Sequence, residues 1–117
     1  GLRKEETALH LSWSARGATA FWVDLFDVRK NKLVARERLG AAETAASLYP
    51  TLFGGERVVA VVRAFSKAPA PGTEEALDQA LRAADSLAPH TGAWWAAIAA
   101  PGLETEVACT KTGLMKW

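Results

Sequence analysis

The sequence has little of what usually identifies a specialised chemistry. One cysteine, Cys109, occurs in 117 residues, so the chain can form no internal disulfide and offers no cysteine pair for a metal. There are two histidines, and the formal net charge of +1 provides no field to attract nucleic acid or anionic lipid. No apolar run approaches the roughly 20 residues that cross a bilayer. We therefore expect no metal, no cofactor, no nucleic acid and no membrane insertion.

The N-terminus lacks an initiating Met, and no basic segment precedes an apolar run as in a signal peptide. We therefore expect a cytoplasmic domain that has been excised from a longer protein. Its composition, 50% hydrophobic and 23% charged, is typical of globular proteins, and its length suits a single domain over residues 1–117.

The first third of the chain predicts an antiparallel meander of three strands. Residues 7–14 alternate between apolar and polar side chains, which is the period of a half-buried strand. Gly17 marks a turn into a second strand at 19–28, and Asn31 marks a turn into a third at 32–39.

The middle of the chain predicts a helix, a strand and a second helix. Apolar residues at helical spacing favour a helix over 41–49, which Pro50 would end. The β-branched run at 57–65 is apolar on both faces, as expected of a central strand covered on both sides. Residues 73–88 carry an apolar stripe behind Thr73 as N-cap, which is typical of an amphipathic helix.

The last third is less distinctive, because residues 92–100 fit either a strand or a short helix. We favour a strand, since a Pro-Gly turn follows and residues 103–112 alternate beyond it. The predicted order is therefore β-β-β-α-β-α-β-β. The fold class is α+β, or α/β, with the helices packed on one mixed sheet.

Part of the chain, about residues 9–66, resembles a fibronectin type III domain. Trp13 ends a strand as the core tryptophan of that family does, and residues 21–25 match the next strand. Residues 52–64 are similar to the family's leucine-x-proline-glycine-x-x-tyrosine stretch and the strand after it. The resemblance implies an all-β sandwich.

The chain departs from that family at three points. Gly54 stands in place of the proline and Val58 in place of the tyrosine, so the hydrogen bond of the tyrosine corner would be absent. The helix predicted at 73–88 has no place in an all-β sandwich. We therefore predict a mixed fold instead.

The element order also resembles the ribonuclease H-like and actin-like folds, in which three antiparallel strands precede alternating helices and strands. Nucleases of that group carry a metal-binding Asp on the first strand, where residues 7–14 offer only His10. The glycine-bearing phosphate loop of the actin-like ATPases is also missing from the first hairpin. The resemblance therefore implies a topology without evident chemistry.

Asp24 is the candidate catalytic acid, and its role depends on the register of the second hairpin. A two-residue loop at Lys30-Asn31 places Asp24 opposite Glu37, where two carboxylates would share a proton and could perform acid–base catalysis. A three-residue loop centred on Asn31 instead places Asp24 opposite Arg38 as an ordinary ion pair. Both registers remain open.

The remaining candidate residues have ordinary structural interpretations. Asp27 points to the opposite face from Asp24 and is expected to be an exposed strand end. His10, His90 and Cys109 are too far apart in sequence to indicate a metal site. His90 suits the end of the preceding helix, and Cys109 is expected to be a small buried apolar residue.

Tryptophan is abundant, with five in the chain, and exposed tryptophans often anchor protein interfaces. Trp94 and Trp95 are adjacent and point in different directions on a strand or a helix, and Trp117 ends the chain. We take these three as candidate partner-binding residues. The sequence favours a non-catalytic interaction or assembly domain that binds a protein partner or itself. The alternative is a small enzyme, or a degenerate ribonuclease H-like or actin-like domain, that uses Asp24 and Glu37.

Overall fold

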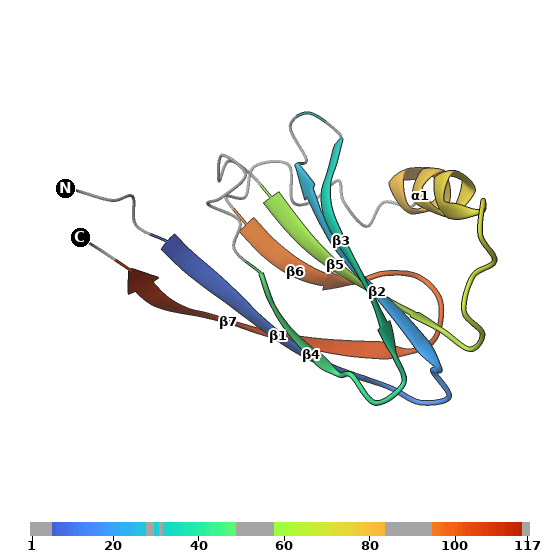
Figure 1. Cartoon of the computed structure of the whole chain (residues 1–117), viewed down its shortest axis with the longest axis horizontal. Helices are drawn as coiled ribbons and strands as arrows, with labels where there is room; N and C mark the ends of the chain where they lie inside the picture. The colour runs from blue at the N-terminus through green and yellow to red at the C-terminus, as the bar shows by residue number, and fades with distance from the viewer. Residues whose placement is uncertain (1–5, 28–29, 31, 49–57, 84–94, 116–117) are drawn as a thin grey trace.

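The computed structural model describes residues 6–27, 30, 32–48, 58–83 and 95–115 (Figure 1). The elements follow in the order β1 (Glu6–Ala15), β2 (Ala20–Asp27), β3 (Lys32–Gly40), β4 (Ala45–Leu48), β5 (Val58–Phe65), α1 (Glu74–Ala83), β6 (Trp95–Ala99) and β7 (Thr105–Met115). The fold is therefore mixed α+β, with one helix among the described residues. That helix is neither long nor apolar enough to cross a membrane.

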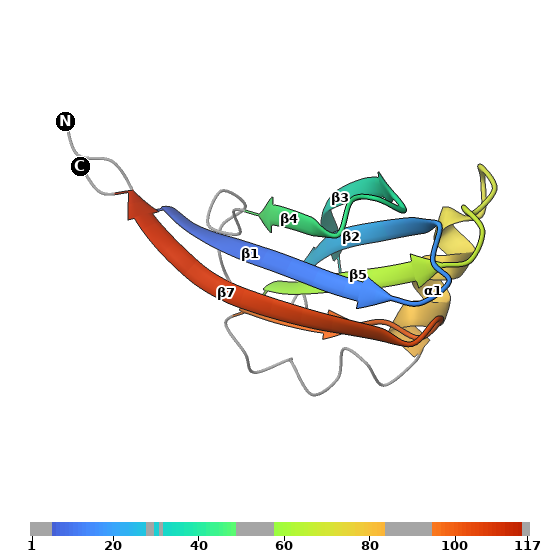
Figure 2. The ribbon, with the colours of Figure 1, turned by 90° about the horizontal axis from the view of Figure 1, so that it is seen from below.

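The strands form two sheets rather than the one mixed sheet that we predicted. A three-stranded sheet has the order β4-β1-β7, and a four-stranded sheet has the order β3-β2-β5-β6. Their inner faces stack (Figure 2), and apolar side chains from both sheets make one core. The buried members of this core are Leu9, Leu11, Trp13, Phe21, Val23, Leu25, Leu48, Ala60, Val62 and Ala64.

The predicted three-stranded meander is wrong, because β1 and β2 belong to different sheets. The turn at Gly17, whose φ is 82°, carries the chain from one sheet to the other instead of closing a hairpin. β2 pairs with β3 and β5, and β1 pairs with β4 and β7. A glycine turn between two alternating strands is equally compatible with either connection, which explains the error.

The predicted helix at 41–49 is also wrong, since residues 45–48 form the short strand β4. Leu48 is 7% exposed and lies opposite Leu9, so the strand buries the one large apolar side chain of this segment. Ala45, by contrast, is exposed. The helical pattern depended largely on alanines, which do not require burial.

The central strand and the amphipathic helix are confirmed. β5 lies between β2 and β6, and Val59, Ala60, Val61 and Val62 are each 0% exposed. The helix predicted at 73–88 is observed as α1, and residues 84–88 lie outside the described part. α1 packs on the outer face of the four-stranded sheet through Leu81, which lies in a second apolar cluster with Phe26, Val59 and Val61.

The strand interpretation of residues 92–100 is confirmed for β6, which pairs with β5 in parallel. Parallel neighbours need a crossover connection, and α1 lies within the one that joins β5 to β6. Stacked sheets agree with what the fibronectin type III resemblance implies. The helix and the parallel pair depart from it, because both sheets of that family are antiparallel.

Candidate functional site

Asp24 lies on the outer face of β2, beneath α1, and is 0% exposed. Its neighbour on β3 is Arg36, so both registers that we considered from the sequence are wrong. The pair next to the turn is Asp27–Lys32, so four residues separate the two strands instead of the two or three that we considered, and a bulge then shifts the pairing by one residue. The pairs Leu25–Ala35 and Phe26–Leu33 leave the intervening Val34 unmatched.

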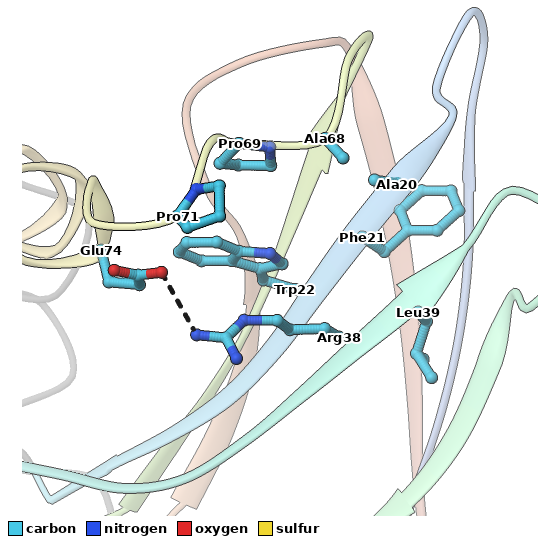
Figure 3. Close-up of a pocket in the computed structure, with 9 residues that line it drawn as sticks. All are labelled: Ala20, Phe21, Trp22, Arg38, Leu39, Ala68, Pro69, Pro71 and Glu74. Carbon is cyan, nitrogen blue, oxygen red and sulfur yellow. Dashed lines mark ion pairs between the residues drawn. The ribbon is translucent and has the colours of Figure 1, made fainter.

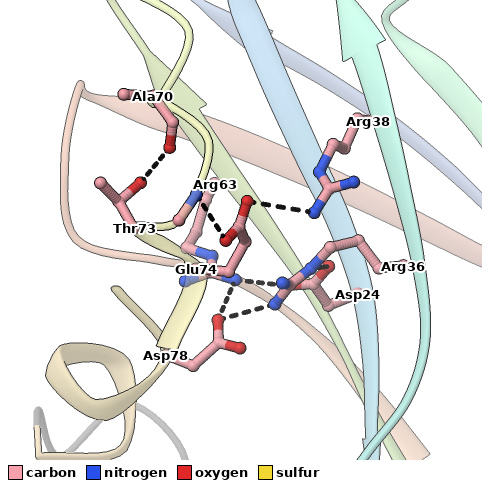
Figure 4. A network of polar contacts seen from close by, with 9 residues as sticks. Asp24, Arg36, Arg38, Arg63, Ala70, Thr73, Glu74 and Asp78 are labelled. Atoms are coloured by element: carbon pink, nitrogen blue, oxygen red, sulfur yellow. Dashed lines mark hydrogen bonds and ion pairs between the residues drawn. The ribbon is translucent and has the colours of Figure 1, made fainter. Parts of the chain in front are cut away.

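Asp24 is the centre of a network of two aspartates and two arginines (Figure 4). Arg36 donates from Nε to Asp24 Oδ1 at 2.8 Å and from Nη2 to Asp24 Oδ2 at 3.2 Å, a two-point contact. Arg63, from β5, donates its Nη2 to Asp24 Oδ2 as well.

Asp78 extends the network into the helix. Its Oδ1 accepts hydrogen bonds from Arg36 Nη2 at 2.6 Å and from Arg63 Nη2 at 2.9 Å. Arg63 Nη1 also donates to the carbonyl of Leu77 at 3.3 Å. Side chains from β2, β3, β5 and α1 therefore meet in one cluster, which we call the buried charge cluster.

The buried charge cluster contains two positive and two negative charges, and its members are almost wholly removed from water. The side chains of Asp24 and Arg63 are 0% and 4% exposed, and those of Arg36 and Asp78 are each 11% exposed. Burial by itself lowers the pKa of the Arg36 guanidinium. The hydrogen bonds and charges of Asp24 and Asp78 outweigh that effect and raise this pKa above its usual value, so the positive charge is retained.

This arrangement does not provide the pair of carboxylates that acid–base catalysis would need. Glu37 lies opposite Val23, whose side chain belongs to the inner core, while Asp24 points to the outer face. The two acids are therefore on different faces of the sheet. Asp24 accepts from two guanidinium groups, which hold it as an ion-pair partner for two arginines.

The second feature is a groove of about 350 Å³ at the end of the sheet where β2 begins and β3 ends (Figure 3). We call it the Trp22 groove. Its lining residues are Ala20, Phe21, Trp22, Arg38, Leu39, Ala68, Pro69, Pro71 and Glu74. Strands β2 and β3 supply one side, and the loop between β5 and α1 supplies the other.

Trp22 forms the centre of this groove. Its ring meets Phe65 edge-on, with the centroids 5.2 Å apart, and Pro69 and Pro71 lie on one side of it in Figure 3. The guanidinium of Arg38 lies 5.3 Å from the ring centroid on the other side. The indole nitrogen points towards the part of the groove where Ala20 and Phe21 lie.

The loop that forms the far wall is fixed at its junction with α1. Thr73 donates its hydroxyl to the carbonyl of Ala70 at 2.6 Å, and the Thr73 amide donates to the same oxygen at 3.3 Å. Glu74 Oε2 accepts a hydrogen bond from the Gly72 amide at 3.1 Å. The two prolines and these hydrogen bonds restrict the conformations of the loop, so the wall is stiff.

The tryptophans that we predicted as partner-binding residues are not tested by this geometry. Trp94 and Trp117 lie outside the described residues. Trp95 begins β6, which is an edge strand of the described part of its sheet, but its side chain lies outside the description. These three residues stay a prediction.

Other expected residues are placed differently from our interpretation. Asp27 is 7% exposed rather than exposed, and its Oδ1 accepts the Lys30 amide at 3.1 Å, which closes the turn after β2. Cys109 is exposed rather than buried, although it lies opposite buried Leu11. His10 hydrogen bonds through Nδ1 to Ser47 Oγ at 2.7 Å on the exposed face of the three-stranded sheet.

Sequence reasoning missed Arg36, Arg63 and Asp78 as partners of Asp24. A signal was present, because Arg63 interrupts an apolar run that we expected to be covered on both faces. A buried arginine requires a buried acceptor. Asp24 in the neighbouring apolar run was the natural candidate.

No family model, no curated protein and no solved structure matches this chain. Among the described residues, no group of three or more His, Cys, Asp or Glu side chains could hold a metal ion. The buried charge cluster and the Trp22 groove are the features of the described residues that bear on function.

Proposed function

We propose that this chain is a non-catalytic interaction domain that binds a segment of a protein partner in the Trp22 groove. The observation that carries the proposal is the composition of the groove. Its apolar base consists of the partly buried Leu39 and the edges of Phe21 and Trp22, which are only 2% and 3% exposed, and it lies between a proline-containing wall and a charged rim. Aromatic residues and arginine are the side chains most enriched at binding hot spots.

The size of the groove supports a peptide segment as the ligand. A volume of about 350 Å³ is at the lower end of the range for ligand pockets, and it accommodates one large side chain with its adjoining backbone. The stiff wall reduces the entropy lost when a ligand is ordered.

The buried charge cluster supports the same proposal indirectly. Its charges are paired with each other and attach α1 to the sheet, and Glu74 at the start of α1 belongs to the rim of the groove. The cluster therefore positions the binding surface. The alternative of an Asp24–Glu37 enzyme has no geometric basis, because the two acids lie on different faces.

The proposal is tested by selecting peptides from a random display library against the domain and measuring their affinities with synthetic copies. The blocking variant is Ala68→Trp, at an exposed position that lines the groove. The control is Ala70→Trp, in the same loop, also exposed and also followed by proline, but not part of the lining.

We expect Ala68→Trp to reduce the affinity of selected peptides by tenfold or more, and Ala70→Trp to leave it within about twofold. Peptides that bind both variants equally well would show that the groove is not the binding surface. A library that yields no binder to the folded domain would also contradict the proposal.

A further inference from the structure

Arg38 differs from the other arginines around Trp22 in its availability. Its side chain is 59% exposed, and its Nη2 lies 3.7 Å from Glu74 Oε1 across the rim of the Trp22 groove. A pair at this distance in water is weak and exchanges readily with other partners. Arg38 can therefore bind an anionic group from outside.

Arg36 provides the internal comparison, because it lies two residues away and contacts the same ring. Its guanidinium is 4.6 Å from the centroid of Trp22, but Asp24 and Asp78 already hold it. Its side chain is 11% exposed, so a ligand cannot use it without breaking the buried charge cluster. Among the described residues that line this groove, the accessible positive charge is that of Arg38.

Arg38 is also held in place before any ligand arrives. Contact with the face of Trp22 restricts the guanidinium to the rim of the groove (Figure 3). The position of the Glu74 carboxylate shows where a carboxylate lies when it pairs with the Arg38 guanidinium. Glu74 Oε2 separately accepts a hydrogen bond from the Gly72 amide, so Glu74 keeps a second partner when Arg38 binds a ligand carboxylate.

We propose that the Trp22 groove recognises a peptide segment in which a large apolar side chain lies next to a carboxylate. The apolar side chain occupies the space between Phe21, Leu39 and Pro69, and the carboxylate replaces Glu74 on Arg38. Arg38 is then the residue that determines specificity, and Glu74 is an internal competitor. This inference rests on the proposed function, since it names the ligand class of the same groove.

The test uses the peptides selected from the display library, each resynthesised with its acidic residues changed to glutamine or asparagine. Their affinities are measured for the wild-type domain and for Arg38→Gln, Glu74→Gln and Arg16→Gln. Arg16 is an exposed arginine in the turn after β1 and does not line the groove, so its variant removes the same charge elsewhere. An unchanged near-ultraviolet circular dichroism spectrum establishes that each variant is folded.

We expect Arg38→Gln to weaken the acidic peptides by about tenfold and to leave their neutral versions unchanged, because a charge-assisted hydrogen bond is lost only in the first case. Glu74→Gln should strengthen the acidic peptides severalfold, since the competitor is removed. Arg16→Gln should have little effect, and added salt should weaken only the acidic peptides.

The inference and the proposed function fail in different ways. If neutral peptides bind as tightly as acidic ones and Arg38→Gln has no effect, the carboxylate specificity is wrong, while Ala68→Trp still blocks binding. If Arg38→Gln and Arg16→Gln weaken binding equally, the charge effect is non-specific and the inference is also wrong. Loss of sensitivity to Ala68→Trp overturns the groove itself.

Discussion

The two faces of strand β2 bury side chains of different kinds. Phe21, Val23 and Leu25 point inward to an apolar core shared by both sheets. Asp24, between the last two, points outward to the buried charge cluster under α1. One strand therefore has a core of apolar contacts on one side and a network of directed contacts on the other.

The difference between the two faces explains how α1 is held at one position on the sheet. Apolar contacts are non-directional, so an apolar face alone tolerates a helix in several positions. Hydrogen bonds from Arg36 and Arg63 to Asp78 have fixed distances and directions, and they define where α1 lies on the sheet. The outer face of the sheet therefore fixes the position of α1 in addition to burying its apolar side chains.

The largest effect is expected from Asp24→Ala. The substitution leaves Arg36 and Arg63 with one carboxylate between them, and breaking a buried ion pair in this way costs about 3–5 kcal/mol. We expect the free energy of unfolding, measured by urea denaturation, to fall by that amount.

A second substitution tests the cause of this loss. In an Arg63→Met background, Asp24→Ala should cost much less, because fewer charges are left unpaired. If Asp24→Ala lowers the free energy of unfolding equally in both backgrounds, the loss does not come from unpaired arginine charges. The two faces of β2 would then not differ in the way that we propose.

Leu25→Ala alters the inner face at the adjacent residue. Leu25 is 0% exposed, and removing its side chain from the core should lower the free energy of unfolding by about 2–5 kcal/mol. The same urea measurement in the Arg63→Met background is the comparison. We expect Leu25→Ala to cost the same in both backgrounds, because removing a charge on the outer face does not fill a cavity in the inner core. A smaller cost in the Arg63→Met background would show that the two faces are coupled.

Asp78→Asn should have the smallest of these effects, about 1.5–3 kcal/mol, since the amide oxygen can still accept a hydrogen bond. Its signature is local. Amide hydrogen exchange in α1 should accelerate more than exchange in β2 and β5, because the contacts that fix the helix are weakened. Equal acceleration in all three elements would indicate that Asp78 stabilises the whole domain and not the position of the helix.

Elements with strong local signals could be predicted from the sequence. The run at Val58–Phe65 and the helix from Glu74 have patterns that few other structures satisfy, and both were found. The short strand Ala45–Leu48 was mistaken for a helix, because its alanines carry no information about period. Local pattern therefore decides an element only where large side chains define it.

The sheet arrangement and the charge cluster depended on contacts between distant residues. Asp24 and Arg63 are 39 residues apart, and only the pairing of β2 with β5 brings them together. The length of the connection between β2 and β3 and the bulge at Val34 together place Asp24 opposite Arg36, and no residue type in the sequence indicates the bulge. The groove likewise joins β2 and β3 to a loop more than 25 residues further along, so its residues share no motif.

The pairing of β1 with β7 has a mechanical consequence. Glu6 lies opposite Met115, so the two outermost described strand residues are neighbours at one end of the molecule, far from α1 (Figure 1). Tension applied between these two points acts across the ladder, parallel to its hydrogen bonds. The hydrogen bonds between β1 and β7 would then break one after another from this end, instead of all bearing the load at the same time. The domain would yield at a low pulling force and would peel from this end, with the groove at the opposite end the last part to be disturbed.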